Sequence, residues 1–599
     1  MNALLRASWA LFALAARTDR GRLARASALV ILGYLATPLI ALGLMAFTNA
    51  AIARDAGAAT WFAVGVAVLL VVELMAVHFA HLAYFEVGEL VEVRLNAQLG
   101  DLLHGAHGLH HFDDPRVTDA VALMREGFAQ TRDGVEALLQ FCGLALQTAV
   151  TTILLCWLDP WLILLPIAAL PPVLIGDRAQ RVLDAAKEAT SESTRLAAHL
   201  LAVSTSMASA KEVRIFHAEE ELIERQAGHW SLVSAALRTA QFKSAALRAS
   251  GQLLFALAYG GAIIVVISQA AAHEANLGQV VLVITLAVQV SLQVSSALGL
   301  LSRLQSCAVT QGRLAKLRER LGEEDTRRSS AVEVVEIPRR LERGIRLENV
   351  SFAYPGTDRL VLRELSLDIP PGATTAFVGE NGAGKSTLVK LLCGLYEPTA
   401  GRIMIDGVDL RDIDPDLWRA RLATLFQDFA MFELRLRENV GVGELDRLRD
   451  DDALTAALRR AKAEPILERV PGGLDGLLGH GYGDGVELSG GQWQSLGLSR
   501  CHLRDDPLLL VLDEPASALD AAAEHALFAQ YAESARQAGR DSGAITIFVS
   551  HRFSTVRMAD VIVVLDQGGL VEVGDHARLM ESGGLYAELF GLQARAYRH

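Results

Sequence analysis

The sequence predicts a chain in two parts, a membrane α-helical bundle with long cytoplasmic extensions followed by an α/β domain. Three observations support this. The first half contains apolar stretches long enough to cross a bilayer. These stretches end near residue 303, and short segments typical of strands begin at Ile345. A glycine-rich loop at 379–387 then joins an apolar strand pattern to a helical pattern.

The composition agrees with a mixture of membrane and water-exposed parts. Of the 599 residues, 51% are hydrophobic, and the mean hydropathy is +0.29. The net charge of −13 argues against a nucleic-acid partner. The 5 cysteines are scattered and form no CxxC pair, so neither a disulfide framework nor a zinc site is predicted.

Six stretches are predicted to span the membrane, because each has about 20 mostly apolar residues. They are 26–49, 59–83, 134–157, 161–181, 249–270 and 278–303. Residues 1–25 form an N-terminal segment, and 304–344 form a charged linker to the domain at 345–599. Arginines gather in the N-terminal segment and in the two long loops, so these loops and both termini are expected in the cytoplasm. The chain is predicted to be a multi-pass protein of the cell (plasma or inner) membrane.

The two long loops, after the second and fourth predicted spans, are amphipathic. They predict helices that continue past the bilayer and turn back near 110–119 and 211–221. The first turn includes part of a histidine cluster, His104, His107, His110 and His111. We interpret this cluster as solvated polar residues rather than a metal site, because glycines weaken the helix that would gather the imidazoles.

Several polar residues lie inside the predicted spans. Gln289 and Gln293 share one face of the last span, and Glu73 lies in the second. Two interpretations stay open for the glutamines, the lining of a polar cavity and hydrogen bonds between helices. For Glu73 we favour a structural role, in which its carboxylate is paired with a neighbouring group or snorkels to the membrane surface, since this needs no ligand.

Residues 379–387, GENGAGKST, match the phosphate-binding pattern G-x-x-x-x-G-K-[ST]. The predicted contacts are Gly379, Glu380, Asn381, Gly382, Ala383, Gly384, Lys385, Ser386 and Thr387. The glycines let backbone N–H groups point at phosphates, and the next helix adds the positive end of its dipole. Lys385 would hold the β- and γ-phosphates of ATP, and Ser386 would offer its hydroxyl to Mg²⁺.

Two further apolar segments end in polar residues. The segment 507–515, PLLLVLDEP, reads as a buried parallel strand that ends at Asp513 and Glu514. Because ligands bind at the carboxyl ends of such strands, Asp513 is expected to hold Mg²⁺ and Glu514 to polarise the attacking water. A second strand, 545–551, ends in His551, which is expected to sense the γ-phosphate.

A second anion-binding helix end is predicted at LSGGQ, 488–492. One ATP would already be held on one side by the loop of Lys385. A second copy of the domain, related by a two-fold axis, could close the other side with LSGGQ. Two ATP molecules would then lie between two subunits.

This set of motifs resembles the ATP-binding cassette (ABC) superfamily, and six spans followed by a cassette resemble exporter-type half-transporters. The resemblance implies that Tyr354 stacks on adenine and that Gln427 contacts Mg²⁺ or water. It also implies a signature and a following loop made of Ser489, Gly490, Gly491, Gln492 and Asp520. The turns at 110–119 and 211–221 look like the two intracellular regions that dock on cassettes.

Two stretches refine the resemblance. The stretch GHGYGDGV before the signature departs from the VGERG usual in such exporters, which leaves a cross-talk role for that loop unsupported. FQDF together with ELSGGQWQ is similar to the lanthipeptide and related peptide exporters. No cysteine-protease segment precedes the first span, so leader cleavage by this chain is not expected.

The resemblance implies a homodimeric, ATP-hydrolysing exporter that moves a peptide or modified peptide out of the cytoplasm by alternating access. A lipid or hydrophobic-drug exporter and one half of a heterodimer are the alternatives. A non-transporting ATPase is disfavoured by the six spans, and a sensor by the intact Glu514 and His551. An importer is disfavoured because importer cassettes are usually separate chains.

Overall fold

The structure is a computed structural model that describes residues 2–105, 108–168, 170–271, 276–329, 337–514, 537, 539–550 and 552–596. It divides into two compact units. The first comprises Met1–Asp101 and Ala120–Lys316, and the second comprises Leu102–Asp119 and Leu317–His599. The loop that carries the first predicted turn therefore belongs with the α/β domain.

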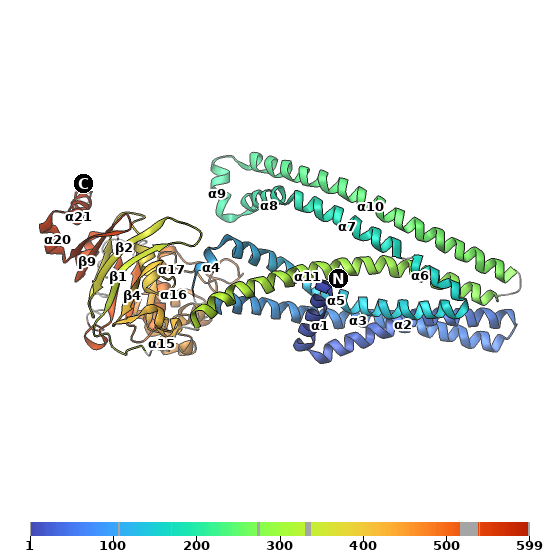
Figure 1. Cartoon of the computed structure of the whole chain (residues 1–599). Coiled ribbons are helices and arrows are strands. Elements are labelled where there is room, and N and C mark those ends of the chain that lie inside the picture. Colours follow the sequence, from blue (N-terminus) through green and yellow to red (C-terminus); the bar gives the residue numbers. More distant parts are fainter. Residues whose placement is uncertain are drawn as a thin grey trace. The chain divides into compact units, whose positions relative to one another are not determined.

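The first unit consists of long helices that run beside one another (Figure 1). They are α1 (Asn2–Thr18), α2 (Arg20–Ile52), α3 (Ala56–Gly105), α5 (Pro115–Leu158), η1 (Pro160–Ile163), α6 (Leu164–Ala168), α7 (Leu170–Ala189), α8 (Ser191–Thr205), α9 (Met207–Ile215), α10 (Glu219–Ala271) and α11 (Leu277–Ser329). Among the described residues, 5 helices are long and apolar enough to cross a membrane: α2, α3, α5, α10 and α11. They contain five of the predicted spans.

The predicted span at 161–181 includes η1, α6 and the start of α7, and Ala169 between the two helices lies outside the described residues. Past its apolar start, α7 carries Arg178 and Arg181. The fourth crossing therefore stays a prediction, whereas residues 304–329 of the predicted linker continue the last span as helix.

The faces of the spans that point outward are apolar. Only 11% of the most apolar window of α3 is buried, and Trp61 is 78% exposed. The inward faces share a cluster that includes Leu155, Phe255 and Leu286, from α5, α10 and α11. An apolar surface of this extent around a packed interior is what a lipid environment requires.

The second unit contains two sheets. The antiparallel sheet has the order β2-β1-β4-β5, with β1 (Ile345–Ala353), β2 (Leu360–Ile369), β4 (Ala400–Ile405) and β5 (Val408–Asp409). The other has the order β10-β9-β3-β8-β7-β6, with β3 (Thr374–Val378), β6 (Leu422–Leu425), β7 (Leu509–Asp513), β8 (Ile545–Val549), β9 (Val561–Asp566) and β10 (Gly569–Gly574). Its pairs are parallel except β10 with β9.

Helices pack around these sheets. The described ones are α4 (His110–Asp113), α12 (Lys385–Leu392), η2 (Leu410–Asp412), α13 (Pro415–Arg419), α14 (Leu436–Gly441), η3 (Leu445–Arg447), α15 (Asp451–Arg460), α16 (Glu464–Arg469), η4 (Gly473–Asp475), α17 (Gly490–Leu503), α19 (Phe553–Val556), α20 (His576–Ser582) and α21 (Leu585–Ala596). Every residue of β3 and β8 is buried, as expected for strands covered on both faces.

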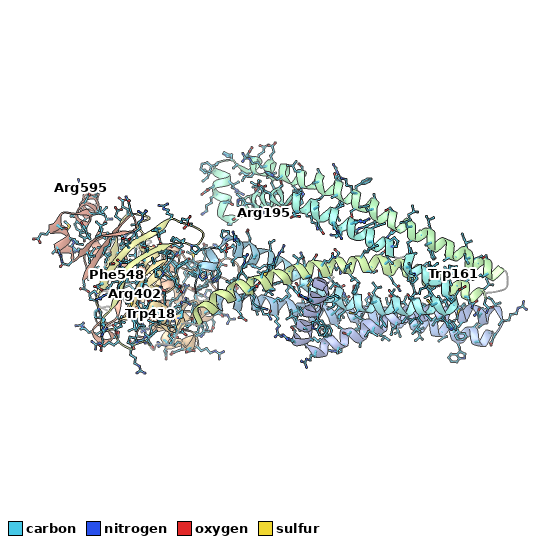
Figure 2. All side chains as sticks on the ribbon, in the orientation of Figure 1. Trp161, Arg195, Arg402, Trp418, Phe548 and Arg595 are labelled. Carbon is cyan, nitrogen blue, oxygen red and sulfur yellow. The ribbon has the colours of Figure 1, made fainter. Side chains whose placement is uncertain are left out.

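Trp418 of α13 is the largest fully buried side chain in the described core, and Figure 2 labels it inside the α/β domain. Its indole N–H donates to the carbonyl oxygen of Leu392, 3.0 Å away, at the end of α12. Asp414 begins the short helix by accepting backbone N–H groups. Trp418 therefore fixes the helix that follows the phosphate-binding loop.

Two substitutions separate the volume of Trp418 from its hydrogen bond. We expect Trp418→Ala to lower the free energy of unfolding of the domain by about 3–5 kcal/mol through the cavity it leaves. Trp418→Phe should lower the free energy of unfolding by only about 1–3 kcal/mol. Most of the aromatic volume is kept, but the buried carbonyl oxygen of Leu392 loses its hydrogen-bond donor. Thermal unfolding of the full chain in detergent measures both, and equal midpoints for the two variants would contradict this account.

Candidate functional site

The phosphate-binding loop follows β3 directly and depends on glycine. Gly379 has a φ of 152°, and a Cβ there would collide with the backbone oxygen of Leu565 on β9. Gly384 has a φ of 98° and precedes α12, and a Cβ there would lie 2.6 Å from the side chain of Leu362. Larger residues would open the loop at both places. The free N–H groups at the start of α12 are thus presented to a ligand at this turn.

Lys385 reaches back across its own loop. Its ammonium donates to the carbonyl oxygens of Gly379 and Glu380, both 2.8 Å away. Partial burial lowers the pKa of Lys385, while the charges of Glu514 and Asp513 act in the opposite direction. The loop therefore surrounds a positive charge, which suits phosphate oxygens.

Asp513, the last residue of β7, is 3% exposed. Burial raises its pKa to about 6, and a hydrogen bond with Ser386 counteracts part of this rise. In the described part of the chain its Oδ1 atom is buried without a hydrogen-bond partner. A buried carboxylate oxygen with unused lone pairs, beside a hydroxyl, fits a small hard cation such as Mg²⁺.

Glu514 has a φ of 50°, an uncommon conformation for a residue with a side chain. Contacts with three described residues help to hold it. Its N–H donates to the carbonyl oxygen of Val549 at 2.9 Å, and its own carbonyl oxygen accepts from the side chain of Gln494 at 3.1 Å. Its carboxylate accepts from the side-chain amide of Gln427 at 3.0 Å. The structure thus brings Gln427, Asp513 and Glu514 to the edge of the sheet where the phosphate-binding loop begins.

Gln494 is a site residue that the sequence reasoning missed. It is 4% exposed on α17, between Trp493 and Leu496 in an otherwise buried helix face. A polar residue on such an apolar face usually has a structural partner, and this feature could have drawn attention to it. Gln494 connects the helix that begins at the signature to the backbone of Glu514.

Tyr354 lies next to the helix of the phosphate loop. Its hydroxyl is 3.1 Å from the hydroxyl of Thr387, and its ring contacts Phe352 and Tyr396 edge to face, with centroids 5.0 and 5.5 Å apart. The ammonium of Lys390 lies 6.0 Å from the ring centroid. These contacts fix the Tyr354 ring beside the loop, where the predicted adenine contact would be.

The loop at 102–119 docks on the same domain. The N–H of Leu109 donates to the carbonyl oxygen of Leu395 at 3.0 Å, and the hydroxyl of Tyr396 donates to the carboxylate of Asp113 at 2.5 Å. Burial raises the pKa of Tyr396, and Asp113 acts in the same direction. Tyr396 therefore contacts both α4 and the ring of Tyr354.

The signature residues cap their own helix. Ser489 and Gln492 form a reciprocal capping box at the start of α17, and the Gln492 side chain also accepts from Arg469 at 3.3 Å. Gly490 and Gly491 make the first turn. Across the described residues, the side-chain hydrogen bonds of Ser489 and Gln492 go to this helix end and to Arg469, and none goes to the loop at 379–387.

Three predicted residues lie outside the described part of the chain: His551, Asp520 and His107. Among the described residues, no group of three or more His, Cys, Asp or Glu could hold a metal ion. The prediction of solvated histidines is wrong for His111, which is 3% exposed and whose Nε2 lies 2.9 Å from the carbonyl oxygen of Leu103.

The polar residues of the predicted spans join helices to one another. The hydroxyl of Thr37 donates to Glu73 at 2.7 Å, and Gln289 donates to the carbonyl oxygen of Thr37 at 3.1 Å. Gln293 accepts from Thr148 at 3.1 Å. Glu73, Gln289 and Gln293 also line a cavity of about 220 Å³. Hydrogen bonding between helices and the lining of a cavity therefore coexist here.

Comparison with known proteins places both units in one family. Residues 26–294 match the model of the ABC transporter transmembrane region, and 362–517 match that of the ABC transporter. A solved bacterial Atm1-family ABC exporter with ATP bound has a TM-score of 0.76 and 25% identity, covering 96% of this chain and 98% of that one.

Two curated relatives are similar over shorter regions. The subtilin transport ATP-binding protein SpaT of Bacillus subtilis is 37% identical over 242 residues, 40% of this chain and 38% of the relative. The ATP-dependent lipid A-core flippase of Chromohalobacter salexigens is 35% identical over 342 residues, 57% of this chain and 56% of the relative. The matched part thus spans less than two thirds of either relative. The match to the transmembrane region precedes the match to the ATP-binding domain along the chain, which is the domain order of exporters. The chain therefore belongs to the ABC transporters and is a multi-pass membrane protein.

Proposed function

We propose that this protein is an ATP-hydrolysing exporter that works as a homodimer and moves a peptide or modified peptide out of the cytoplasm. The observation that carries the proposal is the placement of Glu514, which contacts with three described residues help to hold at the edge of the sheet beside Lys385 and Asp513. A domain that only bound ATP would not need a carboxylate fixed in a strained backbone conformation.

Each residue of the site has a distinct task in this proposal. Lys385 and the N–H groups at Gly382, Ala383 and Gly384 bind the phosphates, with Glu380, Asn381 and Thr387 completing the loop. Ser386, Asp513 and Gln427 would hold Mg²⁺, which neutralises charge on the β- and γ-phosphates when bound. Glu514 accepts the proton of the attacking water, and Gln427 positions its carboxylate. His551 contacts the γ-phosphate.

A second subunit completes the site. The N-terminus of α17, a helix of 14 residues, is formed by Ser489, Gly490, Gly491 and Gln492. In the described structure the side chains of Ser489 and Gln492 bond to this helix end, and Gln492 also accepts from Arg469. We assign this end to the γ-phosphate bound by the partner subunit, with Asp520 nearby. Closure of two cassettes would then depend on ATP, because each nucleotide would join the two subunits.

The docked loop would carry this closure to the membrane part. Tyr396 contacts Asp113 on one side and Tyr354 on the other, so the loop and the proposed adenine contact share one cluster of rings. With the termini in the cytoplasm, as the arginine distribution indicates, both long loops and the cassettes would lie on the same side of the membrane. Alternating access would follow from their movement.

The similarity to the subtilin transport protein and the FQDF and ELSGGQWQ stretches support a peptide as cargo. The similarity to lipid A-core flippases favours a lipid as the alternative. A hydrophobic drug, or a heterodimer with a related half-transporter, would use the same cassette chemistry.

Glu514→Gln should lower the ATPase rate of the protein in nanodiscs by about a hundredfold or more, because the general base is lost while the shape of the side chain is kept. ATP binding should remain, since the loop of Lys385 is untouched. The rate of phosphate release and the binding of a fluorescent ATP analogue measure the two effects.

The matched control for this test is Glu581→Gln, an exposed glutamate of α20 far along the chain from the site residues. It should hydrolyse ATP like the wild type.

Stimulation of the wild type by lanthipeptides, but not by lipid A or a hydrophobic drug, supports the peptide cargo. Wild-type rates in Glu514→Gln would remove the general base from the mechanism.

The binding of Mg²⁺ should depend on pH through Asp513. Since burial raises its pKa to about 6, a proton occupies the carboxyl below that pH and competes with the ion. We expect the Mg²⁺ concentration for half-saturation to rise by up to about tenfold for each unit of pH below about 6. Titration of Glu514→Gln with Mg²⁺ and ATP measures this without hydrolysis, and the dependence should begin at a somewhat lower pH there, because the charge of Glu514 also raises the pKa of Asp513. A titration unaffected by pH, or unchanged in Asp513→Asn, would contradict the assignment.

The contact of the docked loop can be tested by amide hydrogen exchange. Tyr396→Phe removes the hydroxyl that donates to Asp113, so the Leu109 amide should exchange about tenfold faster. Asp113→Asn is the matched variant, because its side-chain oxygen still accepts the bond, and it should exchange nearly as the wild type. Equal protection of this amide in Tyr396→Phe would show that the hydroxyl does not hold the loop.

A further inference from the structure

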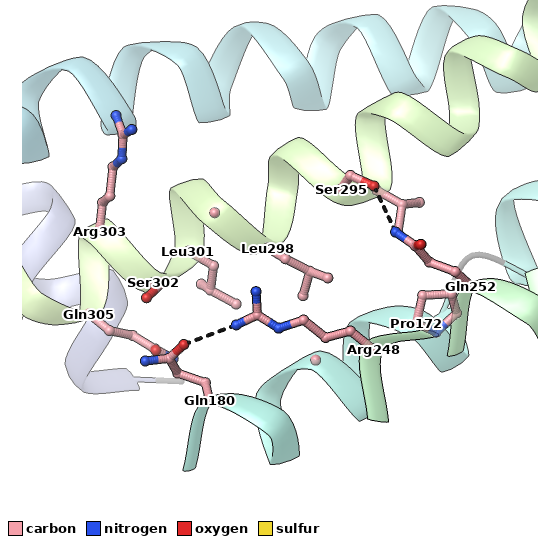
Figure 3. Close-up of a pocket in the computed structure, with 13 residues that line it drawn as sticks. Pro172, Gln180, Arg248, Gln252, Ser295, Leu298, Leu301, Ser302, Arg303 and Gln305 are labelled. Carbon is pink, nitrogen blue, oxygen red and sulfur yellow. Dashed lines mark hydrogen bonds between the residues drawn. The ribbon is translucent and has the colours of Figure 1, made fainter. Parts of the chain in front are cut away.

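A cavity with a volume of about 470 Å³ lies between α7, α10 and α11 in the first unit (Figure 3). Its polar lining consists of Gln180, Arg248, Gln252, Ser295, Ser302, Arg303 and Gln305. Two of the residues that line it are ionisable, and both are arginines. A volume of this size holds a small ligand or the head of a larger one.

Arg248 is the main charge in this space. Figure 3 shows its guanidinium extending between Gln180 and Leu298. One of its N–H groups donates to the side-chain oxygen of Gln180 at 3.3 Å. A guanidinium has five N–H donors, so most of them remain for a ligand. Among the described residues, no carboxylate lies within ion-pair distance of Arg248, although Asp184 accepts from the same Gln180 at 3.1 Å.

Arg303 contributes a more distant charge. Its side chain leaves α11 in a different direction in Figure 3 and approaches the carboxylate of Glu136, 3.8 Å away. This weak pairing leaves the site with a net positive charge, most of it at Arg248. Gln252 donates to Ser295 at 3.4 Å, which closes the other end of the cavity with neutral groups.

The remaining lining is apolar and lies at the cytoplasmic ends of three predicted spans. Arg248 comes directly before the predicted span 249–270, and Arg303 ends the span 278–303. Pro172, Val294, Leu298 and Leu301 provide apolar walls. A site with a cation at the membrane surface and apolar walls beside it suits a molecule with an anionic head and an apolar part.

We propose that this cavity binds the carboxylate or phosphate of an amphipathic anion, with Arg248 as the anchoring residue. A guanidinium binds both groups through two parallel hydrogen bonds. Binding of an anion at Arg248 does not depend on the proposed export function. Only the identification of this anion as cargo rests on it. A resident lipid of the inner leaflet would present the same chemistry, and the experiment separates the two sources.

The test is calorimetric titration of the full chain with dodecyl phosphate, in nanodiscs of phosphatidylcholine and without ATP, with the heat of empty nanodiscs subtracted. Arg248→Gln should weaken binding by about tenfold or more, because a charge-assisted pair is lost. Arg248→Lys should weaken binding by about a few-fold, since the positive charge is kept but the two parallel hydrogen bonds of the guanidinium are lost. Dodecyltrimethylammonium should not compete with dodecyl phosphate for the wild type.

Two further variants complete the test. Arg238→Gln removes an exposed arginine of the same helix that does not line the cavity, and binding should stay as in the wild type. Gly299 has open space around its Cα, so Gly299→Leu should fill the cavity and weaken binding without a change of charge. Equal weakening in Arg238→Gln and Arg248→Gln, or unchanged binding in Arg248→Gln, would overturn the site.

Phosphatidylglycerol added to the nanodiscs identifies the source of the anion. If it displaces dodecyl phosphate from the wild type but not from Arg248→Gln, a lipid head occupies the site. If dodecyl phosphate stays bound, the site selects a molecule other than the resident anionic lipid, as a cargo site would. Because no step needs hydrolysis, a failure of the Glu514 prediction and a failure of this site are separate results.

Discussion

The site depends on the parallel pairing of β3, β8 and β7. Thr375 and Phe377 of β3 lie beside Ile547 and Val549 of β8, and Val549 lies beside Asp513 of β7. Parallel strands end at one edge of a sheet, so this register brings the loop of Lys385 and the two carboxylates together. A shift of one residue would turn Asp513 to the other face and separate it from Ser386.

The same edge combines two unfavourable features that a ligand can offset. Asp513 is a buried carboxylate whose pKa is raised, and Glu514 has a left-handed backbone. Each costs on the order of 1–3 kcal/mol in an isolated domain. Glu514 is kept in place despite this cost by accepting from the side chains of Gln427 and Gln494 and by donating its N–H to the carbonyl oxygen of Val549. A cation bound at Asp513 would lower the cost there, because it would favour the ionised carboxylate.

The parts predicted correctly from the sequence are those encoded in consecutive residues. The loop at 379–387 and the buried strands before Asp513 and at 545–549 each have a local pattern with a single physical interpretation. The contacts of Gln494 with Glu514 and of Tyr396 with Asp113 join residues far apart in the chain, and no local pattern specifies them. The helical linker after residue 304 was missed because a charged composition suits both a connector and an exposed helix.

Two elements connect the cassette with the membrane part of the chain. The loop at 102–119 docks on the cassette through Leu109 and Asp113, and α11 continues without a break from the last span to Ser329. Leu298 and Ser302, which line the cavity of Arg248, lie on this same helix. The cavity and the start of the α/β domain are therefore parts of one continuous element, since α11 belongs to both units. If binding at Arg248 and binding of ATP are coupled through this element, thermodynamic linkage requires the coupling free energy to be the same in both directions.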